Sequence, residues 1–299
     1  VPETISADRV MQMQNFVRPV ASIKTIKMVP DTGLMDIADL KSKISSNTAS
    51  VYFENPTYLG GIETGAHEIV GIAKSKGALA TVGVDPITLG VISPPSEYGA
   101  DIVVGDIQPL GIHMYGGGGL GGFIASNDNP ELIAEYNALL VSIAPGLRPG
   151  EFGFDYSTFD RTSYEKRGIS PDYIGTTQWL WVIIAGVYLS LMGPVGMKEV
   201  GKTIMERSSY ASSMLGSLPG IKSPAFPSVF FKEFVVDFSN TGKTVTEINA
   251  ELLDRGIFGG FDLSNQFKSL GQSSLYCVTE VHDKDDIDFL VQSLKEVLT

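Results

Sequence analysis

The sequence predicts an α/β protein: a mainly parallel sheet with helices on both faces, followed by a small α+β domain. Strand and helix patterns alternate through the first half, and the expected strands are almost continuously apolar, as in sheets that are covered on both sides. The 299 residues, 43% of them hydrophobic, can bury one large core or two moderate ones. We expect the large domain over residues 1–193 and the small domain over residues 194–299.

Apolar runs and helical spacings locate the elements of the large domain. The expected strands cover residues 23–29, 49–54, 78–84, 101–104 and 122–125. The expected helices cover residues 36–44, 63–76, 86–91 and 129–143. Gly77 should end the second of these helices, and Pro130 stands at the first turn of the last one.

The second half of the sequence lacks the regular alternation of strands and helices. Residues 144–177 are rich in Gly, Pro, Tyr, Asp and Ser, and we expect a long irregular crossing segment there. Residues 179–197 contain no charge, but Gly193 and Pro194 interrupt the run, so a buried core helix is expected rather than a membrane span. In the small domain, the expected strands cover residues 233–238 and 274–279, and the expected helices cover residues 245–255 and 285–298.

Charge and cysteine content restrict the class of protein. The net charge of −12 would repel a polyanionic backbone, so nucleic acid is not an expected partner. A single cysteine, Cys277, suggests a reducing compartment, which we take to be the cytoplasm, and its apolar neighbours predict that it is buried in a strand. The chain opens on Val1 rather than Met, and we expect it to begin inside a domain.

The expected ligand site lies where the parallel strands end, because such sheets bind ligands at the carboxyl ends of their strands. Asn55, Asp85 and residues 106–111 follow strands in this way. Asp85 precedes Pro86, so we interpret its carboxylate as the cap of a short helix. No lysine occurs between Gly77 and Glu165, and we expect no primary amine near the cleft.

Three motifs are weak. A G-x-G-x-x-G pattern at Gly116, Gly118 and Gly121 lacks the strand and helix that a dinucleotide fingerprint requires, which favours a backbone that lies close to another chain or ligand. The P-loop pattern of residues 196–203 follows a helix instead of a strand, which favours the start of an amphipathic helix over an independent nucleotide-binding enzyme. The three histidines lack the spacing of metal ligands, so no metal site is expected.

Several segments, in the right order, resemble the alpha-type half of the glycine cleavage system P-protein family. They include the strand and Asn-Pro turn of residues 52–56 and the run PPSEYGADIVVGDIQPLG at residues 94–111. The other matching segments are residues 60–63, 85–90, 187–194, 233–236, 256–263 and 277–280. The chain departs from the family at residues 167–173, and the family's amino-terminal part is absent.

The resemblance implies the fold type I architecture of enzymes that use pyridoxal 5′-phosphate (PLP). In the split form of this family, alpha and beta chains pair, two of each, and the beta-type chain binds PLP through a His-Lys dipeptide. Gln108 and Pro109 stand at those positions here, and proline has no amine. A carboxylate such as Asp85 commonly pairs with the pyridine nitrogen in this fold. The resemblance thus implies a degenerate cofactor site at Asp85, Gln108 and Pro109, with no catalytic residue and no covalent PLP on this chain.

The implied function is that of a non-catalytic subunit of glycine dehydrogenase (decarboxylating), inactive alone. With its beta-type partner it would decarboxylate glycine and pass the aminomethyl group to the lipoyl H-protein. Candidates that would line the active site or contact the partner are His113, Tyr115, Gly117, Gly118 and Arg161. The alternative is a catalytically silent binding or regulatory protein that reuses the enzyme fold.

Overall fold

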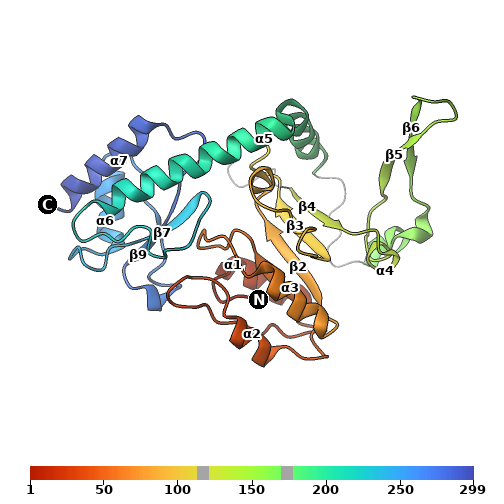
Figure 1. The fold of residues 1–299 in the computed structure, drawn as a ribbon, viewed down its shortest axis with the longest axis horizontal. Coiled ribbons are helices and arrows are strands. Elements are labelled where there is room, and N and C mark those ends of the chain that lie inside the picture. Colours follow the sequence, from red (N-terminus) through yellow and green to blue (C-terminus); the bar gives the residue numbers. More distant parts are fainter. Residues whose placement is uncertain (113–120, 170–177) are drawn as a thin grey trace.

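The computed structural model describes residues 1–112, 121–169 and 178–299 (Figure 1). Its main sheet has the strand order β1-β2-β3-β4, in which the first three strands run parallel and β4 is antiparallel to β3. These strands are β1 (Ser50–Glu54), β2 (Leu79–Val84), β3 (Ile102–Asp106) and β4 (Gly122–Ser126). The predicted α/β class with a mainly parallel sheet is confirmed.

Helix α3 (Ala66–Ser75) connects β1 to β2 and covers the sheet with one apolar face. Its buried residues are Ala66, Ile69, Val70 and Ala73, the helical spacing read from the sequence. Gly77 ends the helix with a φ of 75°, a left-handed conformation that favours glycine. The short helix α2 (Ile37–Lys43) begins after Asp36, whose side chain accepts hydrogen bonds from two backbone N–H groups.

Three expectations for the large domain are wrong. Helix α1 (Ala7–Val17) was not anticipated, and residues 23–29 form isolated bridges rather than a strand. The helix expected over 129–143 is only the short α4 (Pro130–Ile133), and the chain turns into strand β5 (Val141–Pro145) where helix was expected. A short, mostly apolar segment such as residues 141–145 is compatible with a helix or with a strand. Its pairing with another segment of the folded chain decides which of the two forms.

Strand β5 pairs with β6 (Phe152–Tyr156) in a hairpin that projects from the rest of the molecule (Figure 1). The expectation of an irregular segment over 144–177 is therefore wrong at this point. The short 3₁₀ helices η2 (Phe159–Arg161) and η3 (Tyr164–Ile169) follow the hairpin. A lone two-stranded hairpin is marginally stable in water, so this one needs support from another surface.

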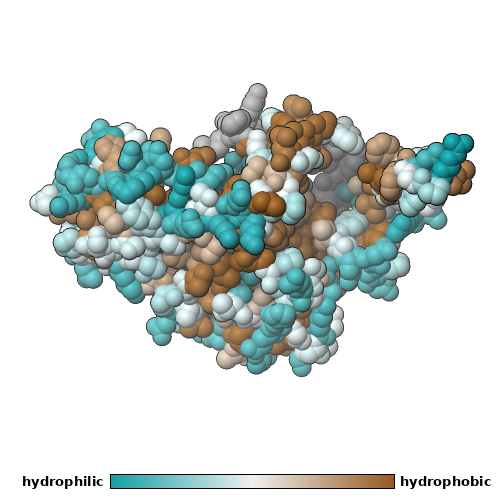
Figure 2. Space-filling view, turned by 45° about the horizontal axis from the view of Figure 1, so that its top comes forward, coloured by the Kyte–Doolittle hydropathy of each residue, from teal (hydrophilic) through white to brown (hydrophobic). Residues whose placement is uncertain are grey.

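Helix α5 (Trp179–Gly216) is kinked at Gly193, which has φ 57° and ψ −175°. Before the kink, one side packs on a small core through Ala185 and Tyr188, but much of the helix is exposed, with Trp179 62% and Leu191 80% accessible. The prediction of a buried core helix is wrong for this half. Figure 2 shows hydrophobic side chains gathered on this upper part of the molecule.

By length and composition, α5 is the one helix of the described residues that could cross a membrane. The straight apolar part before the kink, however, spans only about 21 Å at 1.5 Å per residue. That is short of the hydrocarbon core of a bilayer, which is about 30 Å thick. The straight apolar part of α5 is therefore shorter than an ordinary membrane span.

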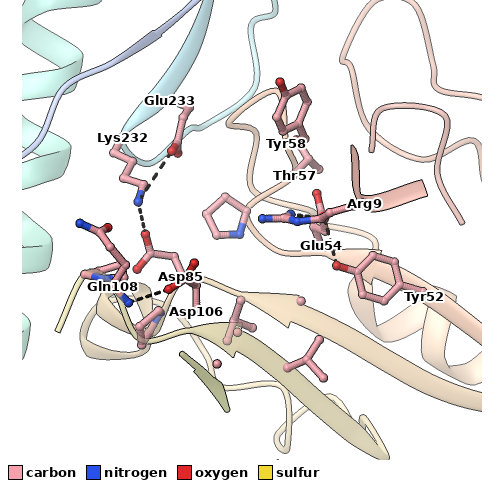
Figure 3. Close-up of a pocket in the computed structure, with 18 of the residues that line it drawn as sticks. Arg9, Tyr52, Glu54, Thr57, Tyr58, Asp85, Asp106, Gln108, Lys232 and Glu233 are labelled. Atoms are coloured by element: carbon pink, nitrogen blue, oxygen red, sulfur yellow. Dashed lines mark hydrogen bonds and ion pairs between the residues drawn. The ribbon is translucent and has the colours of Figure 1, made fainter. Parts of the chain in front are cut away.

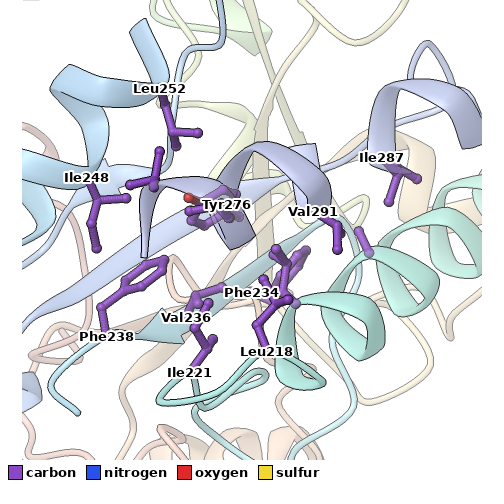
Figure 4. Packing of buried hydrophobic residues seen from close by; sticks show 14 of the residues in the cluster. Leu218, Ile221, Phe234, Val236, Phe238, Ile248, Leu252, Tyr276, Ile287 and Val291 are labelled. Atoms are coloured by element: carbon purple, nitrogen blue, oxygen red, sulfur yellow. The ribbon is translucent and has the colours of Figure 1, made fainter. Parts of the chain in front are cut away.

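The carboxyl-terminal part contains a three-stranded antiparallel sheet of order β7-β9-β8 and two helices. Its elements are β7 (Glu233–Asp237), α6 (Val245–Leu253), β8 (Phe261–Asp262), η4 (Lys268–Leu270), β9 (Ser273–Cys277) and α7 (Lys284–Val297). Their apolar faces and the second half of α5 enclose a core around Phe234 and Tyr276 (Figure 4). Cys277, expected to be buried, is exposed on β9.

Candidate functional site

A cleft of about 760 Å³ lies at the carboxyl ends of the first three strands of the main sheet. Glu54 and Asp106 end β1 and β3, and Asp85 directly follows β2. Parallel strands end at one edge of a sheet, so the topology brings these three carboxylates together. The polar residues that line the cleft are Arg9, Tyr52, Glu54, Thr57, Tyr58, Asp85, Asp106, Gln108, Lys232 and Glu233 (Figure 3).

Asp85 has two roles. One carboxylate oxygen, Oδ1, accepts the Ile87 N–H at 2.9 Å, and Asp85 is the N-cap of the 3₁₀ helix η1 (Pro86–Gly90). The capping role predicted from the sequence is confirmed. The second oxygen, Oδ2, lies 2.5 Å from the Lys232 ammonium nitrogen in an ion pair that is largely buried. Asp85 therefore faces groups of this chain through both oxygens, Oδ1 through a hydrogen bond and Oδ2 through an ion pair that lacks hydrogen-bond geometry.

Lys232 corrects one sequence-based expectation, because it places a primary amine in the cleft. Burial alone would lower the pKa of this amine, but the carboxylates of Glu233 and Asp85 outweigh burial and raise the pKa above its ordinary value. The Glu233 carboxylate lies 3.7 Å from the same nitrogen. A protonated ammonium has no free electron pair, so this amine would have to lose a proton and leave its two carboxylates before it could form an imine.

The backbone that carries Lys232 is fixed from both sides. Phe231 N–H donates to the Gly60 carbonyl at 3.2 Å, and Ile62 N–H donates to the Val229 carbonyl at 2.7 Å. On the other side, the buried hydroxyl of Ser208 in α5 donates to the Phe231 carbonyl at 2.5 Å. Lys232 thus enters the cleft from a segment that bonds to residues 60–62 and to α5.

A second polar cluster lines the other end of the cleft. The Tyr52 hydroxyl donates to Glu54 at 3.0 Å, and Arg9 pairs with the same carboxylate. The Glu54 side chain is only 4% exposed, so its charge depends on these two partners. Burial, and next the Glu54 carboxylate, raise the pKa of the Tyr52 hydroxyl, which keeps it protonated as a donor.

Gln108 and Pro109, the predicted degenerate positions, both line the cleft. The Gln108 N–H donates to Asp106 at 2.6 Å, and the Gln108 side-chain amide donates to the Ile112 carbonyl at 3.1 Å. These bonds close the loop that follows β3 on itself. The structure therefore places Asp85, Gln108 and Pro109 in the same cleft.

The remaining candidates lie elsewhere. His113, Tyr115, Gly117 and Gly118 are outside the described residues. Arg161 pairs with Asp128 at 3.1 Å and lines a separate cleft of about 610 Å³ between β4 and the hairpin. The P-loop pattern of residues 196–203 lies inside helix α5, as the helical interpretation predicted.

The site residues that the sequence did not reveal are Arg9, Tyr52, Lys232 and Glu233. Arg9 belongs to an unanticipated helix, and Lys232 lies far along the chain from Asp85. For Arg9, Lys232 and Glu233 the only sequence signal is a charge beside an apolar run, which most surface charges share. Tyr52 lies within an apolar strand, where a tyrosine is common.

The described residues do not fit a covalently held PLP. Within the described part of the cleft, both cations, Arg9 and Lys232, are already paired with carboxylates, and Pro109 has no amine. Carboxylates outnumber cations by four to two, so the surroundings oppose a phosphate. The expected partner of the pyridine nitrogen, Asp85, is occupied by Lys232.

The sequence pattern of the glycine cleavage system P-protein family matches residues 4–294. The chain is 37% identical over 268 residues to the probable glycine dehydrogenase (decarboxylating) subunit 1 of Staphylothermus marinus, covering 90% of this chain and 57% of that protein. A protein of the same description from Saccharolobus solfataricus is 37% identical over 277 residues, 92% of this chain and 58% of its own. The chain thus spans somewhat more than half the length of these relatives.

Solved structures also show similarity to this family. A glycine decarboxylase (P-protein) of the glycine cleavage system, in inhibitor-bound form, superimposes with a TM-score of 0.85 at 27% identity and covers 99% of this chain and 64% of that one. The cysteine desulfurase of Escherichia coli, with a TM-score of 0.70 at 14% identity, covers 99% of this chain and 71% of its own, and shares the fold alone.

Proposed function

The chain belongs to the glycine cleavage system P-protein family, and we propose that it is a supporting, alpha-type subunit whose own cofactor site is inactive. The observation that carries the proposal is that the described part of the cleft offers no free amine for a Schiff base. Pro109 offers no amine where the resemblance expects the Schiff-base lysine, and the amine of Lys232 is paired with the carboxylates of Asp85 and Glu233. Imine chemistry needs a free amine, so the cofactor would be held by another chain.

In this proposal the partner is a beta-type chain that carries PLP. The complex would decarboxylate glycine and transfer the aminomethyl group to the lipoyl H-protein, in the cytoplasm, as two alpha and two beta chains. The names of the relatives support a subunit role, since each is described as subunit 1 of a glycine dehydrogenase (decarboxylating).

Two uncovered apolar surfaces support a large interface. In the register of the hairpin, Val141 faces Tyr156, Ile143 faces Phe154, and Pro145 faces Phe152. These pairs share one face of the ribbon, and most of their side chains are exposed. The first half of α5 adds a second apolar surface. Apolar areas of this kind mark protein-binding sites.

The proposal is tested by producing the chain alone, a lysine-bearing beta-type chain alone, and both together. We expect co-purification of the two chains, with glycine decarboxylation and an aldimine absorbance band only where the beta-type chain is present. In a matched control, the beta-type chain with its Schiff-base lysine changed to alanine should still co-purify but lose activity.

Glycine decarboxylation or an aldimine band from this chain alone would contradict the proposal. Failure to associate with any lysine-bearing homologue would favour the alternative, a silent binding or regulatory protein.

A further inference from the structure

We propose that Lys232 is a built-in counter-ion that occupies Asp85 and so closes this chain's cleft to PLP and to other cationic pyridine rings. The inference goes beyond the proposed subunit role, because it concerns residues of this chain alone. Loss of the Schiff-base lysine would by itself leave an empty pocket. The ion pair instead fills the position that a ring nitrogen would need.

The geometry of the pair carries the inference. Asp85 Oδ1 is used by the Ile87 N–H, and Oδ2 lies 2.5 Å from the Lys232 nitrogen. The side chains of Lys232 and Asp85 are only 20% and 12% exposed. Figure 3 shows Lys232 reaching Asp85 across the cleft from the side of β7. A protonated ring nitrogen at Oδ2 would lie beside this ammonium and would be repelled by it.

A tethered cation has an advantage over a free ligand. The ammonium is already held close to Asp85, so pairing costs no loss of translational freedom, whereas a free ring must lose that freedom on binding. The tether is also stiff, since residues 229 and 231 are bonded to residues 60–62, and Ser208 holds the Phe231 carbonyl. Swinging Lys232 out would leave Asp85 and Glu233 as unpaired carboxylates in a half-buried site.

Close packing leaves little room for the segment to move. A Cβ atom on Gly60 would lie 1.8 Å from the Glu233 carbonyl oxygen, so the two backbones touch at this point. Gly60 has a φ of 92°, which suits glycine alone. The position of Lys232 is therefore set by backbone contact as well as by charge.

The experiment uses pyridoxamine, which carries the pyridine ring without the aldehyde and the phosphate. It can neither form an imine with surface lysines nor suffer the repulsion of a phosphate by the acidic cleft. Binding to the full chain is measured by titration calorimetry for the unaltered protein, Lys232→Ala, Lys232→Arg and the double variant Asp85→Asn/Lys232→Ala.

We expect Lys232→Ala to bind pyridoxamine at least about tenfold more tightly than the unaltered chain, because Asp85 becomes free and space opens beside it. Lys232→Arg keeps the positive charge and should bind pyridoxamine no more tightly than the unaltered chain. The double variant lacks the Asp85 carboxylate and should not show the increased affinity of Lys232→Ala. Lys284→Ala is the matched control, since it breaks an exposed ion pair with Asp288 outside the cleft and should bind no better than the unaltered chain.

A second measurement covers the case in which Lys232→Ala folds poorly. Adding n-butylammonium, which replaces the missing side-chain cation, should raise the melting temperature of Lys232→Ala but not that of the unaltered chain or the double variant. n-Butanol, which lacks the charge, should not restore it.

Equal pyridoxamine affinity for the unaltered chain and Lys232→Ala would overturn the proposal. So would a gain that persists after Asp85→Asn, or a melting temperature that butylammonium leaves unchanged. Association with a beta-type chain could fail while all these results are obtained, so the two proposals are tested separately.

Discussion

The Glu54 carboxylate has partners from two separate segments of the chain. It is buried and accepts from Tyr52 and Arg9, and Arg9 is supplied by a helix about forty-five residues earlier in the chain. The sequence could place Glu54 and Asp85 at strand ends, because strand boundaries are local patterns. It could not pair Glu54 with Arg9 or Asp85 with Lys232, because such pairs exist only once the chain has folded.

Replacing Arg9 with alanine should lower the free energy of unfolding by about 1–3 kcal/mol, the cost of leaving a buried acceptor without its charged partner. Denaturant unfolding monitored by circular dichroism measures the change. Arg9→Lys should recover part of it. Arg18→Ala, at the other end of α1, is the control and should change stability little. An Arg9→Ala protein as stable as the unaltered chain would show that the pair is not formed in solution.

At the scale of elements, the β-α-β segment from β1 to β3 followed from periodicity and glycine positions, and the cap at Asp85 followed from its place before Pro86. The hairpin did not, since residues 141–145, Val-Ser-Ile-Ala-Pro, are too few for a hydrophobic period to separate strand from helix. The exposure of α5 did not follow either. A sequence records that a helix is apolar, but whether its face is buried within one chain or between chains depends on the assembly.

The two faces of the hairpin offer a matched test. Phe154, on the apolar face, is 87% exposed, and Asp155 lies on the opposite face. Phe154→Ser should leave the melting temperature of the isolated chain nearly unchanged but weaken association with the beta-type partner by about tenfold or more, because it removes a large apolar side chain from the interface. Asp155→Ser should change neither. Analytical ultracentrifugation of the mixed chains measures the association, and equal weakening by both variants would refute an interface on the apolar face.

The capping box of α6 gives a second prediction for an element. The Thr244 hydroxyl accepts from the Glu247 N–H, and Glu247 accepts in return from the Thr244 N–H. Thr244→Ala should cost about 1 kcal/mol of stability. Thr246→Ala, inside the same helix, should cost less. Thermal unfolding separates the two.

Hydrogen bonds from the Thr244 backbone and side chain lower the pKa of Glu247 below its ordinary value in the folded chain. The contribution of this carboxylate is therefore present above its ordinary pKa and is lost as the pH falls through the lowered value. Glu247→Gln should remove that part of the acid dependence, which a stability measurement between about pH 5 and pH 2 would detect.

At the scale of the whole molecule, the family and the fold class could be anticipated, because they depend on motifs and strand order. The ion pair between Asp85 and Lys232 could not, since it joins the main sheet to a lysine of the carboxyl-terminal part. Buried hydrophobic cores stabilise the main sheet and the carboxyl-terminal part, but the hairpin and the first half of α5 expose apolar side chains to solvent.

If those surfaces bind the partner, the partner should stabilise the folded chain by mass action. We expect the melting temperature to rise with the concentration of beta-type chain, corresponding to about 2.7 kcal/mol at one hundred times the dissociation constant. Differential scanning fluorimetry over a concentration series measures this. Bovine serum albumin at equal mass is the control, and a melting temperature independent of the partner would exclude a shared interface.

The bend at Gly193 has a practical consequence. The apolar half of the helix before the bend is too short to cross a bilayer, and it exposes a large apolar surface to solvent. The isolated polypeptide should therefore self-associate, and it should elute as a mixture of oligomers in size-exclusion chromatography. Detergent would mask such a surface without giving it a native fit. Co-expression with the companion chain is accordingly the sensible route to homogeneous material.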